Sequence, residues 1–490
     1  MKTLIINPPR FILLKPDHEA AIGGNEDTLS IGYLAAYAVS RGHTVEAVDM
    51  YAWSWDKAKD FVIKSRPDIV AIACSHTVDR GSAYLAARFV KGLDSAIKVV
   101  FGGHHSSAMA EQIVRHLPVD AVVVGEGEVT FEELIRAWEN NGDIHDIKGL
   151  VFMEGERLIK TAERPPIADL DGLPFPLRGE IPRDRTIAAT YPSPLPYLKY
   201  NGKSIGARTY ASMTTSRGCP YKCQFCSVTA FWGASWRIRS TENVVDEIEA
   251  LVEKHGVQHI NFLDDIFSIK PERVIDICNE IIRRRIEITW DNMTRVDSVS
   301  EEMAYCMRKA GCMWTSFGIE TGDDAVMRNI NKEINNDRVI RAFDIFRRQG
   351  IATVALMMVG NPGESRASID ETKKLMRRIR PDLIVAAKTM VMPATELYEQ
   401  ARTTGLIDAG FWLTDAPPPC YTVEHDEAQL DQWADEVFNA TVPLSWNFFC
   451  AKIFGNRAAR IVRNWFDEHT GVRLTRNGLQ IKQRNAASGK

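Results

Sequence analysis

The sequence predicts an α/β protein with three parts in a row: a doubly wound, Rossmann-like sheet, a six-stranded partial barrel of the TIM type, and a helical C-terminal region. Three observations predict this class. The chain has 490 residues, which is too many for one compact core, so two or three domains are expected. Short apolar runs alternate with helical patterns over residues 1–150. The same alternation resumes with a different rhythm over residues 206–400.

Residues 1–150 are expected to form the first domain. Continuous apolar runs predict buried parallel strands, with amphipathic helices between them. The expected strands are 3–7, 44–50, 68–74, 98–103 and 120–127, and the expected helices are 31–43, 80–93, 109–117 and 130–138. Ligands of such sheets bind outside the carboxyl ends of the strands. No G-x-G-x-x-G follows the first strand, so a nicotinamide or flavin site has no support.

The next part, residues 151–205, is rich in proline and turn residues and is expected to be an extended connector packed across the domains. Residues 206–400 are expected to form the barrel, in which Ser240 caps a helix and Gly350 ends another. The expected strands are 210–216, 259–264, 287–293, 313–319, 352–359 and 383–391. In such barrels the chemistry lies at the C-terminal ends of the strands.

The last part, residues 401–490, is expected to be mainly helical, with a proline break at 415–420. Its aromatic residues supply enough apolar surface to pack on the barrel: Trp412, Trp433, Trp446, Phe448 and Phe449. This region could cap an active site or form a stabilising bundle, and the pattern favours neither alternative.

Composition narrows the class of protein further. The formal net charge of −4 argues against a nucleic acid or an anionic membrane as a partner. No stretch is apolar for the length that a transmembrane segment needs, and the N-terminal residues are interrupted too early by Pro8 and Pro9 to form a signal peptide. A cytoplasmic location is therefore expected, where thiols stay reduced.

Three of the nine cysteines lie within eight residues, as Cys219, Cys223 and Cys226 in the spacing C-x3-C-x2-C. The other six are expected to be small buried hydrophobes: Cys74, Cys278, Cys306, Cys312, Cys420 and Cys450. The triplet follows the first expected barrel strand, where a reactive site belongs.

Four roles compete for the triplet. Structural zinc prefers paired C-x2-C units and a fourth ligand, and a second pair is absent. A catalytic zinc held by three cysteines is rare, and a redox dithiol would leave the third cysteine unused. A cubane iron–sulfur cluster accepts closely spaced thiolates and has four irons, so three cysteines leave one iron open to a small molecule. The spacing favours the cluster over zinc.

The triplet, with Phe225 just before its last cysteine, resembles the signature of the radical S-adenosylmethionine (SAM) enzymes over about residues 206–400. The resemblance implies a [4Fe-4S] cluster whose open iron is chelated by the amino and carboxylate groups of SAM. It also implies that one electron cleaves the sulfonium bond and releases a 5′-deoxyadenosyl radical, which takes a hydrogen atom from an unactivated carbon. The protein would supply orientation and exclusion of water.

Further segments resemble the positions that bind SAM in this family. The resemblance implies SAM contacts for Asp264 with its neighbour Asp265, Arg295, Glu320, Gly360 and Pro362. Ordinary structural roles compete: a helix N-cap for Asp265, an ion pair for Arg295 and a turn for Gly360. The family's usual Gly-Gly-Glu-Pro turn is replaced by "LDDIFS", which is typical of the branch that resembles the anaerobic bacteriochlorophyll cyclase and the hopanoid methylases. Ala394 stands where a glycine is more usual, which puts the local geometry in question.

That branch carries an N-terminal cobalamin-binding domain, and residues 1–150 resemble one. The resemblance implies cobalamin contacts in three loops: Ser75, His76 and Thr77; Gly102, Gly103 and His105; Gly125, Glu126 and Glu128. Paired glycines let the backbone approach a bulky nucleotide tail. No D-x-H-x-x-G motif occurs, so the loop of Ser75, His76 and Thr77 would face the cobalt, with His76 either ligating or only packing there. The domain is also known in degenerate form without cobalamin.

Together these features predict an enzyme that functionalises an unactivated carbon of a small-molecule substrate, as a cobalamin-dependent C-methyltransferase of a biosynthetic intermediate. Oxidative cyclisation, or dehydration of a diol or sugar, would use the same parts without methyl transfer. An electron-transfer or iron–sulfur scaffold protein is disfavoured, because it needs neither an open iron nor a second cofactor domain. The resemblance also implies an external electron donor such as flavodoxin or ferredoxin.

Overall fold

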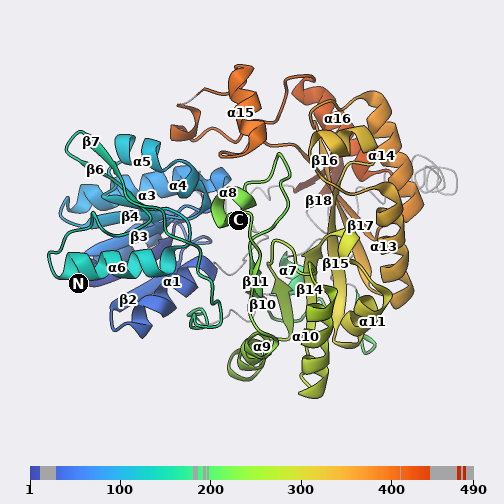
Figure 1. Cartoon of the computed structure of the whole chain (residues 1–490), viewed down its shortest axis with the longest axis horizontal. Coiled ribbons are helices and arrows are strands. Elements are labelled where there is room, and N and C mark those ends of the chain that lie inside the picture. Colours follow the sequence, from blue (N-terminus) through green and yellow to red (C-terminus); the bar gives the residue numbers. More distant parts are fainter. Residues whose placement is uncertain are drawn as a thin grey trace, which may run out of the picture.

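The computed structural model describes residues 1–10, 29–179, 186–190, 195, 198–408, 410–441, 472–475 and 478–481. Figure 1 shows a first sheet and a second sheet side by side, with α8 (Val228–Trp232) between them and α15 (Glu396–Thr403) over their junction. The expected α/β class, with a doubly wound domain followed by a partial barrel, is confirmed.

The first sheet has seven strands in the order β2-β1-β3-β4-β5-β6-β7. The first five are parallel and the last two antiparallel. The strands are β1 (Lys2–Asn7), β2 (Thr44–Asp49), β3 (Ile69–Ala73), β4 (Lys98–Gly102), β5 (Ala121–Val123), β6 (Leu150–Glu154) and β7 (Arg157–Lys160). The β6–β7 hairpin lies in the range expected to be a connector, so the range 151–205 opens with strands of the first sheet.

Helices cover both faces of this sheet because its strands are apolar on both sides. In β1, Leu4 and Ile6 pack in one core and Ile5 packs in the other. The Ile5 face holds α1 (Leu29–Ser40) and α6 (Gly127–Glu139), and the opposite face holds α2 (Trp55–Ser65), α3 (Arg80–Leu93) and α5 (Ala110–His116). The sequence analysis missed α2, whose pattern is mostly polar, although Ser54 caps it through the Lys57 amide.

The second sheet has six parallel strands in sequence order, with β10 and β17 at its edges, and is therefore a partial barrel. The strands are β10 (Tyr210–Met213), β13 (His259–Phe262), β14 (Thr289–Thr294), β15 (Cys312–Glu320), β16 (Ala352–Val359) and β17 (Leu383–Lys388). The outer helices are α9 (Thr241–His255), α10 (Pro271–Arg283), α11 (Glu301–Lys309), α12 (Asp324–Asn329), α13 (Asn336–Gln349) and α14 (Arg366–Ile379). Ser240 caps α9 and Gly350 ends α13, as expected.

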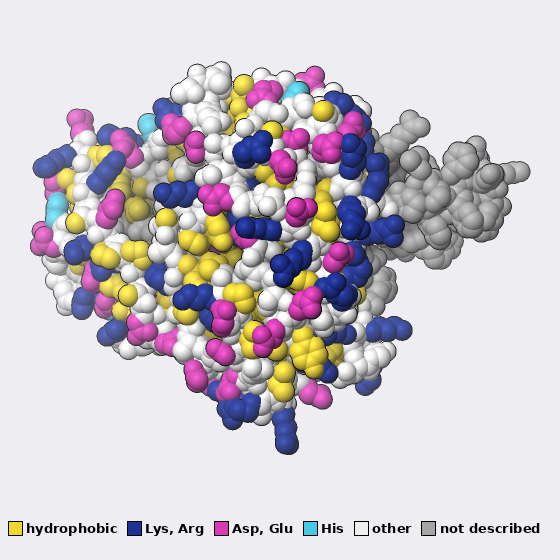
Figure 2. Space-filling model, turned by 45° about the vertical axis from the view of Figure 1, so that its right-hand side comes forward, with side chains coloured by type: hydrophobic (Ala, Val, Ile, Leu, Met, Phe, Trp, Pro, Cys, Tyr) yellow, Lys and Arg dark blue, Asp and Glu magenta, His cyan; other side chains and the backbone are white. Residues whose placement is uncertain are grey.

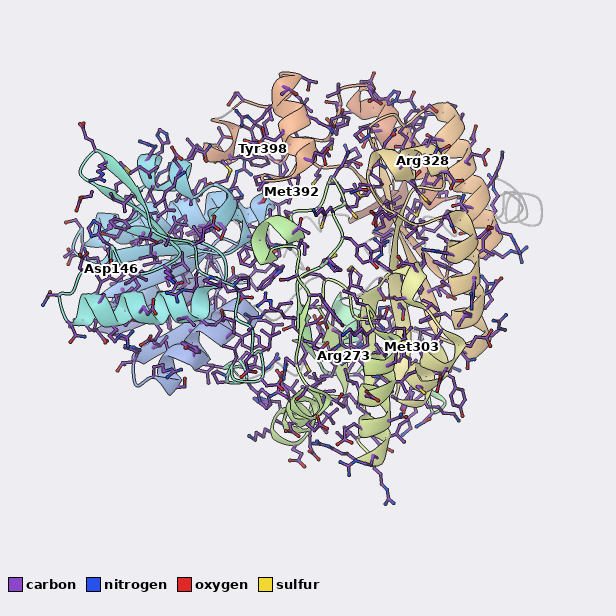
Figure 3. The ribbon with its side chains drawn as sticks, viewed as in Figure 1. Asp146, Arg273, Met303, Arg328, Met392 and Tyr398 are labelled. Carbon is purple, nitrogen blue, oxygen red and sulfur yellow. The ribbon has the colours of Figure 1, made fainter. Side chains whose placement is uncertain are left out.

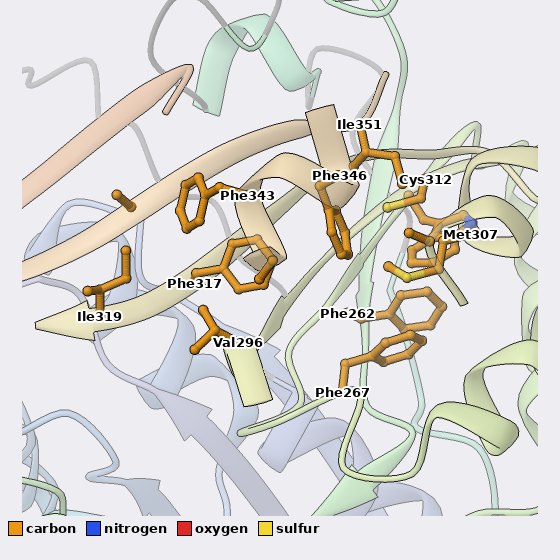
Figure 4. Close-up of a cluster of buried hydrophobic side chains, with 14 of the residues drawn as sticks. Phe262, Phe267, Val296, Met307, Cys312, Phe317, Ile319, Phe343, Phe346 and Ile351 are labelled. Atoms are coloured by element: carbon orange, nitrogen blue, oxygen red, sulfur yellow. The ribbon is translucent and has the colours of Figure 1, made fainter. Parts of the chain in front are cut away.

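A layer of large apolar side chains holds the outer helices on the barrel strands. Phe317 of β15 lies with its ring centroid 5.0 Å from Phe343 and 5.2 Å from Phe346, both on α13. Phe262 and Phe267 stack at 4.8 Å in the same layer, which Figure 4 shows. Burial of such rings supplies roughly 1.5–3 kcal/mol each, so this layer fixes the strand ends that carry the site.

The connector closes the N-terminal end of the barrel. Ile187 of α7 (Ile187–Thr190), Leu195 and Ile205 pack against the bottom of β15 and β16. Between them lies a short antiparallel pair, β8 (Lys199–Tyr200) and β9 (Lys203–Ser204). The site is thereby left at the opposite end of the barrel, where the strands finish.

The C-terminal region contacts both sheets. The 3-10 helix η5 (Phe411–Leu413) packs Trp412 on the first domain, where its carbonyl accepts from Tyr84 Oη at 2.9 Å. Tyr398 of α15 joins the same core and lies beside Met392 over the junction (Figure 3). Helix α16 (Glu427–Phe438) packs Trp433 on the barrel.

Two expectations for this region need comment. Trp446, Phe448 and Phe449 lie outside the described residues. The region also contains two short antiparallel strands that the sequence analysis did not predict, β18 (Val472–Thr475) and β19 (Gly478–Ile481). The alternating apolar residues and the Asn-Gly dipeptide of "VRLTRNGLQI" are a hairpin signal that the helical expectation overlooked.

The surface carries both signs of charge. Figure 2 shows Lys and Arg interspersed with Asp and Glu over the visible face, without one extended field of a single sign. Within the described part of the chain, no helix combines the length and the apolar character that crossing a bilayer requires.

The turn at Ala394, which the sequence singled out, adopts the conformation that favours glycine. Its φ is +60°, and the side chain is exposed. A left-handed conformation costs a residue with a Cβ about 1 kcal/mol.

We expect Ala394→Gly to raise the free energy of unfolding by about 0.5–1 kcal/mol, measured by denaturant titration, because glycine relieves this strain. Ala387→Gly, at an exposed position of β17 without a positive φ, should instead lower it. Equal destabilisation by both substitutions would contradict the strain at Ala394.

Candidate active site

A short antiparallel pair frames the segment that carries the three cysteines. β11 (Ser216–Arg217) pairs with β12 (Arg237–Ile238), and the cysteine loop, residues 218–236, runs between them. The loop starts at Gly218, whose φ is +89°. A Cβ there would lie 2.2 Å from the carbonyl oxygen of Ser235, so the two ends of the loop approach closely only because residue 218 is glycine.

The three thiols lie close enough to influence one another. Burial first, and then the neighbouring Cys223 and Cys219, raise the pKa of Cys226 to about 12. Burial also raises the pKa values of Cys219 and Cys223. A set of partly buried thiols becomes ionised when a cation is bound among them. The donor set therefore has the chemistry of a soft, positively charged ligand.

A cluster and a single metal ion place different demands on the positions of three thiols. Among the described residues, no group of three or more His, Cys, Asp or Glu side chains converges on a point that one metal ion could occupy. In a cubane, each thiolate binds its own iron at a separate corner, so the sulfurs lie farther apart than the ligands of one ion. A cluster therefore does not require the three sulfurs to converge on one point.

Charged side chains surround Cys223. Lys332 and Arg295 lower its pKa and Glu320 raises it, against the larger effect of burial. Lys332 Nζ lies 2.7 Å from Glu320 Oε1, and the ammonium lies 5.8 Å from the centre of the Phe225 ring. Glu320 ends β15 at a register shift with a φ of +70°, which is unusual for a residue with a side chain and typical of functional sites.

Arg295 serves the cysteine loop as well as a local ion pair. Its Nη2 lies 2.9 Å from Asp297 Oδ2 and donates to the Lys332 carbonyl at 3.0 Å. Its guanidinium also stacks on Tyr221 of the cysteine loop, 3.6 Å from the ring centre. The structural ion pair considered from the sequence is therefore present, and the same side chain holds the loop.

The two neighbouring aspartates after β13 have different surroundings. Asp264 is buried and accepts from the Thr215 amide at 2.9 Å, from Thr215 Oγ1 at 3.0 Å and from Ser216 Oγ at 2.5 Å. Asp265 lines the cavity described below and accepts from the Gly218 amide at 3.2 Å. Burial raises the pKa of Asp265 to about 6. Asp264 therefore supports the strand that leads to the cysteines, and Asp265 faces the open space. Lys270, rather than Asp265, stands at the N-cap of the following helix.

Gly360 and Pro362 lie after β16 and beside α16. Gly360 has a φ of +89°, and a Cβ there would lie 2.8 Å from Leu430 of α16. The Pro362 carbonyl accepts from Asn329 Nδ2 at 3.1 Å. Glu364 accepts from the Gly360 amide at 2.5 Å. In this structure Gly360 is needed for the turn and for the close approach of Leu430, which is the turn role weighed from the sequence.

One cavity of about 820 Å³ lies between the two sheets. From the first domain it is lined by eight of the nine residues expected there: Ser75, His76, Thr77, Gly102, Gly103, Gly125, Glu126 and Glu128. From the barrel side it is lined by residues that include Arg217, Ser227, Phe231, Trp232, Asp265 and Met390. The cavity thus joins the loops of the first domain to both flanks of the cysteine triplet.

The ninth expected residue, His105, lies behind the cavity wall. Its Nε2 lies 2.9 Å from Tyr84 Oη and its Nδ1 lies 3.2 Å from Thr77 Oγ1. Burial lowers the pKa of His105 to about 3, so the ring is neutral at ordinary pH. His105 therefore positions Thr77, which itself faces the cavity.

Glu126 and Glu128 make ion pairs that cross from the first domain to the barrel. Glu128 Oε1 lies 2.6 Å from Arg217 Nη2, and Glu126 Oε1 lies 2.6 Å from Arg237 Nη2. The sequence analysis did not identify either arginine or Lys332. Arg217 stands two residues before the first cysteine of the triplet, and this position is the one sequence signal from which it could have been found.

Comparison with known proteins decides the family. The Radical SAM superfamily model matches residues 213–376, and the B12 binding domain model matches residues 19–135. The protein named uncharacterized methyltransferase PH0819, from Pyrococcus horikoshii, is 30% identical over 415 residues, which are 84% of this chain and 85% of that protein. The chain belongs to the radical SAM superfamily.

Two further relatives place this radical SAM enzyme more closely. The anaerobic magnesium-protoporphyrin IX monomethyl ester cyclase of Rubrivivax gelatinosus is 30% identical over 407 residues, which are 80% of this chain and 70% of that protein. The radical SAM methyltransferase TsrM of Kitasatospora setae, solved with cobalamin and a [4Fe-4S] cluster, superposes with a TM-score of 0.66 at 18% identity. That superposition covers 90% of this chain and 82% of TsrM, and it shows a shared fold.

Membership of the family confirms the expected cofactors of this radical SAM enzyme. They are a [4Fe-4S] cluster, SAM and cobalamin. Two glycines of the first domain leave room for a large ligand, because a Cβ at Gly102 or at Gly125 would meet nothing within 4 Å. At Gly103 a Cβ would lie 2.6 Å from Ser75 Oγ, and the φ is +107°, so this position requires glycine. These residues fit a bulky cofactor in the cavity.

The buried carboxyl of Glu364 lies in the turn after β16, and its ionisation can be measured. Its Oε1 is buried and has no hydrogen-bond partner within the described part of the chain. Burial raises the pKa of this carboxyl from about 4.5 to about 7, against the opposing effect of the Gly360 and Asn361 amides. Because the folded state holds the proton more tightly than the unfolded state, this group lowers stability as pH rises from 4.5 through 7.

We expect Glu364→Gln to remove this loss, so that the variant gains stability over the wild type by roughly 3 kcal/mol between pH 5 and pH 8. Denaturant titrations of both proteins across this range measure the difference. A difference that stays constant with pH would show that Glu364 ionises normally in the folded protein.

Proposed function

We propose that this radical SAM enzyme is a cobalamin-dependent C-methyltransferase that acts on an unactivated carbon of a small-molecule biosynthetic intermediate. The observation that carries the proposal is the single cavity that joins the loops of the B12-binding domain to the flanks of the cysteine triplet. A methyl group and a substrate radical can meet only where both cofactors open into one space. The printed name of the Pyrococcus horikoshii relative, a methyltransferase, supports the same reaction class.

Cys219, Cys223 and Cys226 are proposed to hold the cluster, and the framing pair β11–β12 fixes the loop on which they lie. Phe225 packs against the apolar cluster that the first domain shares with α15 and η5. When bound, the cofactors supply the 5′-deoxyadenosyl radical that removes a hydrogen atom and the methyl group that replaces it.

Lys332, Glu320 and Arg295 are proposed to orient SAM beside Cys223. Lys332 supplies a buried positive charge suited to a carboxylate, and Glu320 supplies an acceptor suited to an ammonium group or a ribose hydroxyl. Asp265, which accepts from the Gly218 amide, faces the cavity between the two sheets from the end of β13. Asp264 is proposed to affect the SAM site indirectly, through the strand that it holds. Gly360 and Pro362 are proposed to affect it through the turn after β16.

The loop of Ser75, His76 and Thr77 is proposed to lie under the lower face of cobalamin. His76 is exposed and lines the cavity, whereas Thr77 is buried and bonded to His105. Gly102, Gly103 and Gly125 leave space for the nucleotide tail. Glu126 and Glu128 border the same space, with carboxylates that are paired to the barrel.

An external one-electron donor such as flavodoxin or ferredoxin is proposed to reduce the cluster, because cleavage of SAM in the radical SAM superfamily consumes one electron. The eight cysteines of the described chain are free thiols. This fits a reducing compartment, and we propose the cytoplasm. The relative from Rubrivivax gelatinosus supports oxidative cyclisation as a second candidate reaction.

The deciding experiment follows labelled methyl from SAM into product. Anaerobically purified protein with iron, sulfide, cobalamin and dithionite should release 5′-deoxyadenosine from SAM, and Cys223→Ala should abolish the release. Cys306→Ala, which removes a partly exposed thiol of α11, should retain it. Product that carries the label supports methyl transfer, whereas turnover without label supports cyclisation or dehydration. Absence of iron and sulfide in the wild type would contradict the proposal.

We expect Lys332→Met to weaken SAM binding by about tenfold, measured by equilibrium dialysis on cluster-loaded protein, since a buried charge-assisted bond contributes roughly 1.5–3 kcal/mol. Lys373→Met is the control, because it removes a comparable contact of 2.6 Å between α14 and Glu436 of α16. SAM affinity that is equal in the two variants would exclude a role for Lys332 in the SAM site.

A further inference from the structure

The start of the cysteine loop is held by the first domain. Arg217 Nη2 lies 2.6 Å from Glu128 Oε1, and Arg217 Nη1 lies 3.6 Å from Glu126 Oε1. The exposed fractions of these three side chains are 9%, 6% and 5%. Removing one partner from a buried ion pair leaves an uncompensated charge, so Arg217 keeps its position only while α6 and its preceding loop keep theirs.

The strand after the cysteine loop, β12, is held by one of the same two carboxylates, Glu126. Arg237 on β12 places Nη2 2.6 Å from Glu126 Oε1, and its Nη1 donates to the Ile167 carbonyl at 2.6 Å. Glu126 Oε2 accepts from the Ile167 amide at 2.6 Å. Both strands that frame the cysteine loop are therefore tied to the loop of Gly125 to Glu128, through the arginine–glutamate cluster of Arg217, Arg237, Glu126 and Glu128.

A second loop of the first domain holds the cysteine loop just after the triplet. The His104 ring stacks on Phe231 of α8, with centroids 3.8 Å apart and planes at 24°. It meets Trp232 edge-on at 5.7 Å. Burial lowers the pKa of His104 to about 4, so a neutral ring makes this contact. The triplet is thus bracketed by Arg217 on one side and by Phe231 on the other.

The two loops that make these contacts are the ones that line the cavity with glycines. Gly102 and Gly103 precede His104, and Gly125 precedes Glu126. A ligand that orders these loops from the cavity also fixes the partners of Arg217 and Phe231. A cluster that orders the cysteine loop fixes the same contacts from the other side. When two ligands order one shared set of contacts, the second to bind meets a smaller ordering cost.

We propose that Arg217 and Phe231 are positioning residues through which cobalamin binding and cluster assembly strengthen each other. The inference rests on the proposed function, because it needs both cofactors. Coupling of this kind is reciprocal, so cobalamin should retain the cluster as much as the cluster retains cobalamin.

The experiment measures the dissociation constant of hydroxocobalamin for the full chain, with the cluster reconstituted and with it removed by chelation. We expect about tenfold tighter binding to the cluster-loaded wild type. In the reciprocal measurement, release of iron to a chelator should be slower by a similar factor when hydroxocobalamin is present. Neither readout depends on turnover.

Arg217→Met should reduce the tenfold ratio of the two dissociation constants to about one, while Arg217→Lys should retain part of it. The control is Arg178→Met, which removes another buried ion pair, 3.0 Å from Glu247, outside the cavity lining. It should leave the ratio unchanged. If Arg217→Met does not fold, Phe231→Leu and His104→Ala carry the test, because they keep the arginine–glutamate cluster intact.

Two failures are distinguishable. A wild type that takes up neither cluster nor corrinoid contradicts the proposed function. A wild type that takes up both with a ratio near one contradicts only this inference, as would an Arg217→Met, Phe231→Leu or His104→Ala variant that keeps the wild-type ratio.

Discussion

The active site depends on how the two sheets are positioned against each other, and buried charges at their junction fix that position. Arg217 and Arg237 come from the barrel side, and Glu126 and Glu128 come from the first domain. Buried ion pairs add little net stability over apolar packing, but an unpaired buried charge is strongly unfavourable. An arrangement that displaced one sheet by a few ångströms would separate these charges. The cluster of charges therefore selects one arrangement.

Three positions with positive φ lie at the end of the barrel that carries the site. Glu320 at the end of β15 and Ala394 after β17 both have positive φ, and Gly218 takes a left-handed turn in which a Cβ would clash. Such conformations persist only where the surroundings determine them. Phe317 and Ile319, which lie just before Glu320, belong to the buried apolar layer on the outer side of the barrel. Apolar packing on the outer side of a strand therefore supports the unusual turn at its end.

The fold could be predicted from the sequence because its strands are continuous apolar runs with clear helical patterns between them, as at β3 and α3. The β6–β7 hairpin was not predicted, because the proline and turn residues that closely follow it led to the whole segment being assigned to a connector. The cysteines were found from local spacing. The arginine–glutamate cluster was not, because Arg217 and Glu128 are 89 residues apart and no local pattern links them. The difference between Asp264 and Asp265 depends on which face of a strand end each occupies, which only the structure shows.

The C-terminal region adds a second tie across the junction. The chain leaves β17, crosses to the first domain, where Arg80 Nε donates to the Trp412 carbonyl at 3.2 Å, and returns to pack α16 on the barrel. The arginine–glutamate cluster and Trp412 hold the junction through separate contacts. Two separate contacts resist rotation of the sheets better than one. The distance between the cavity loops and the cysteine loop is therefore fixed before a substrate binds. Radical chemistry benefits from that order, because a reactive group that is already positioned has fewer routes to side reactions.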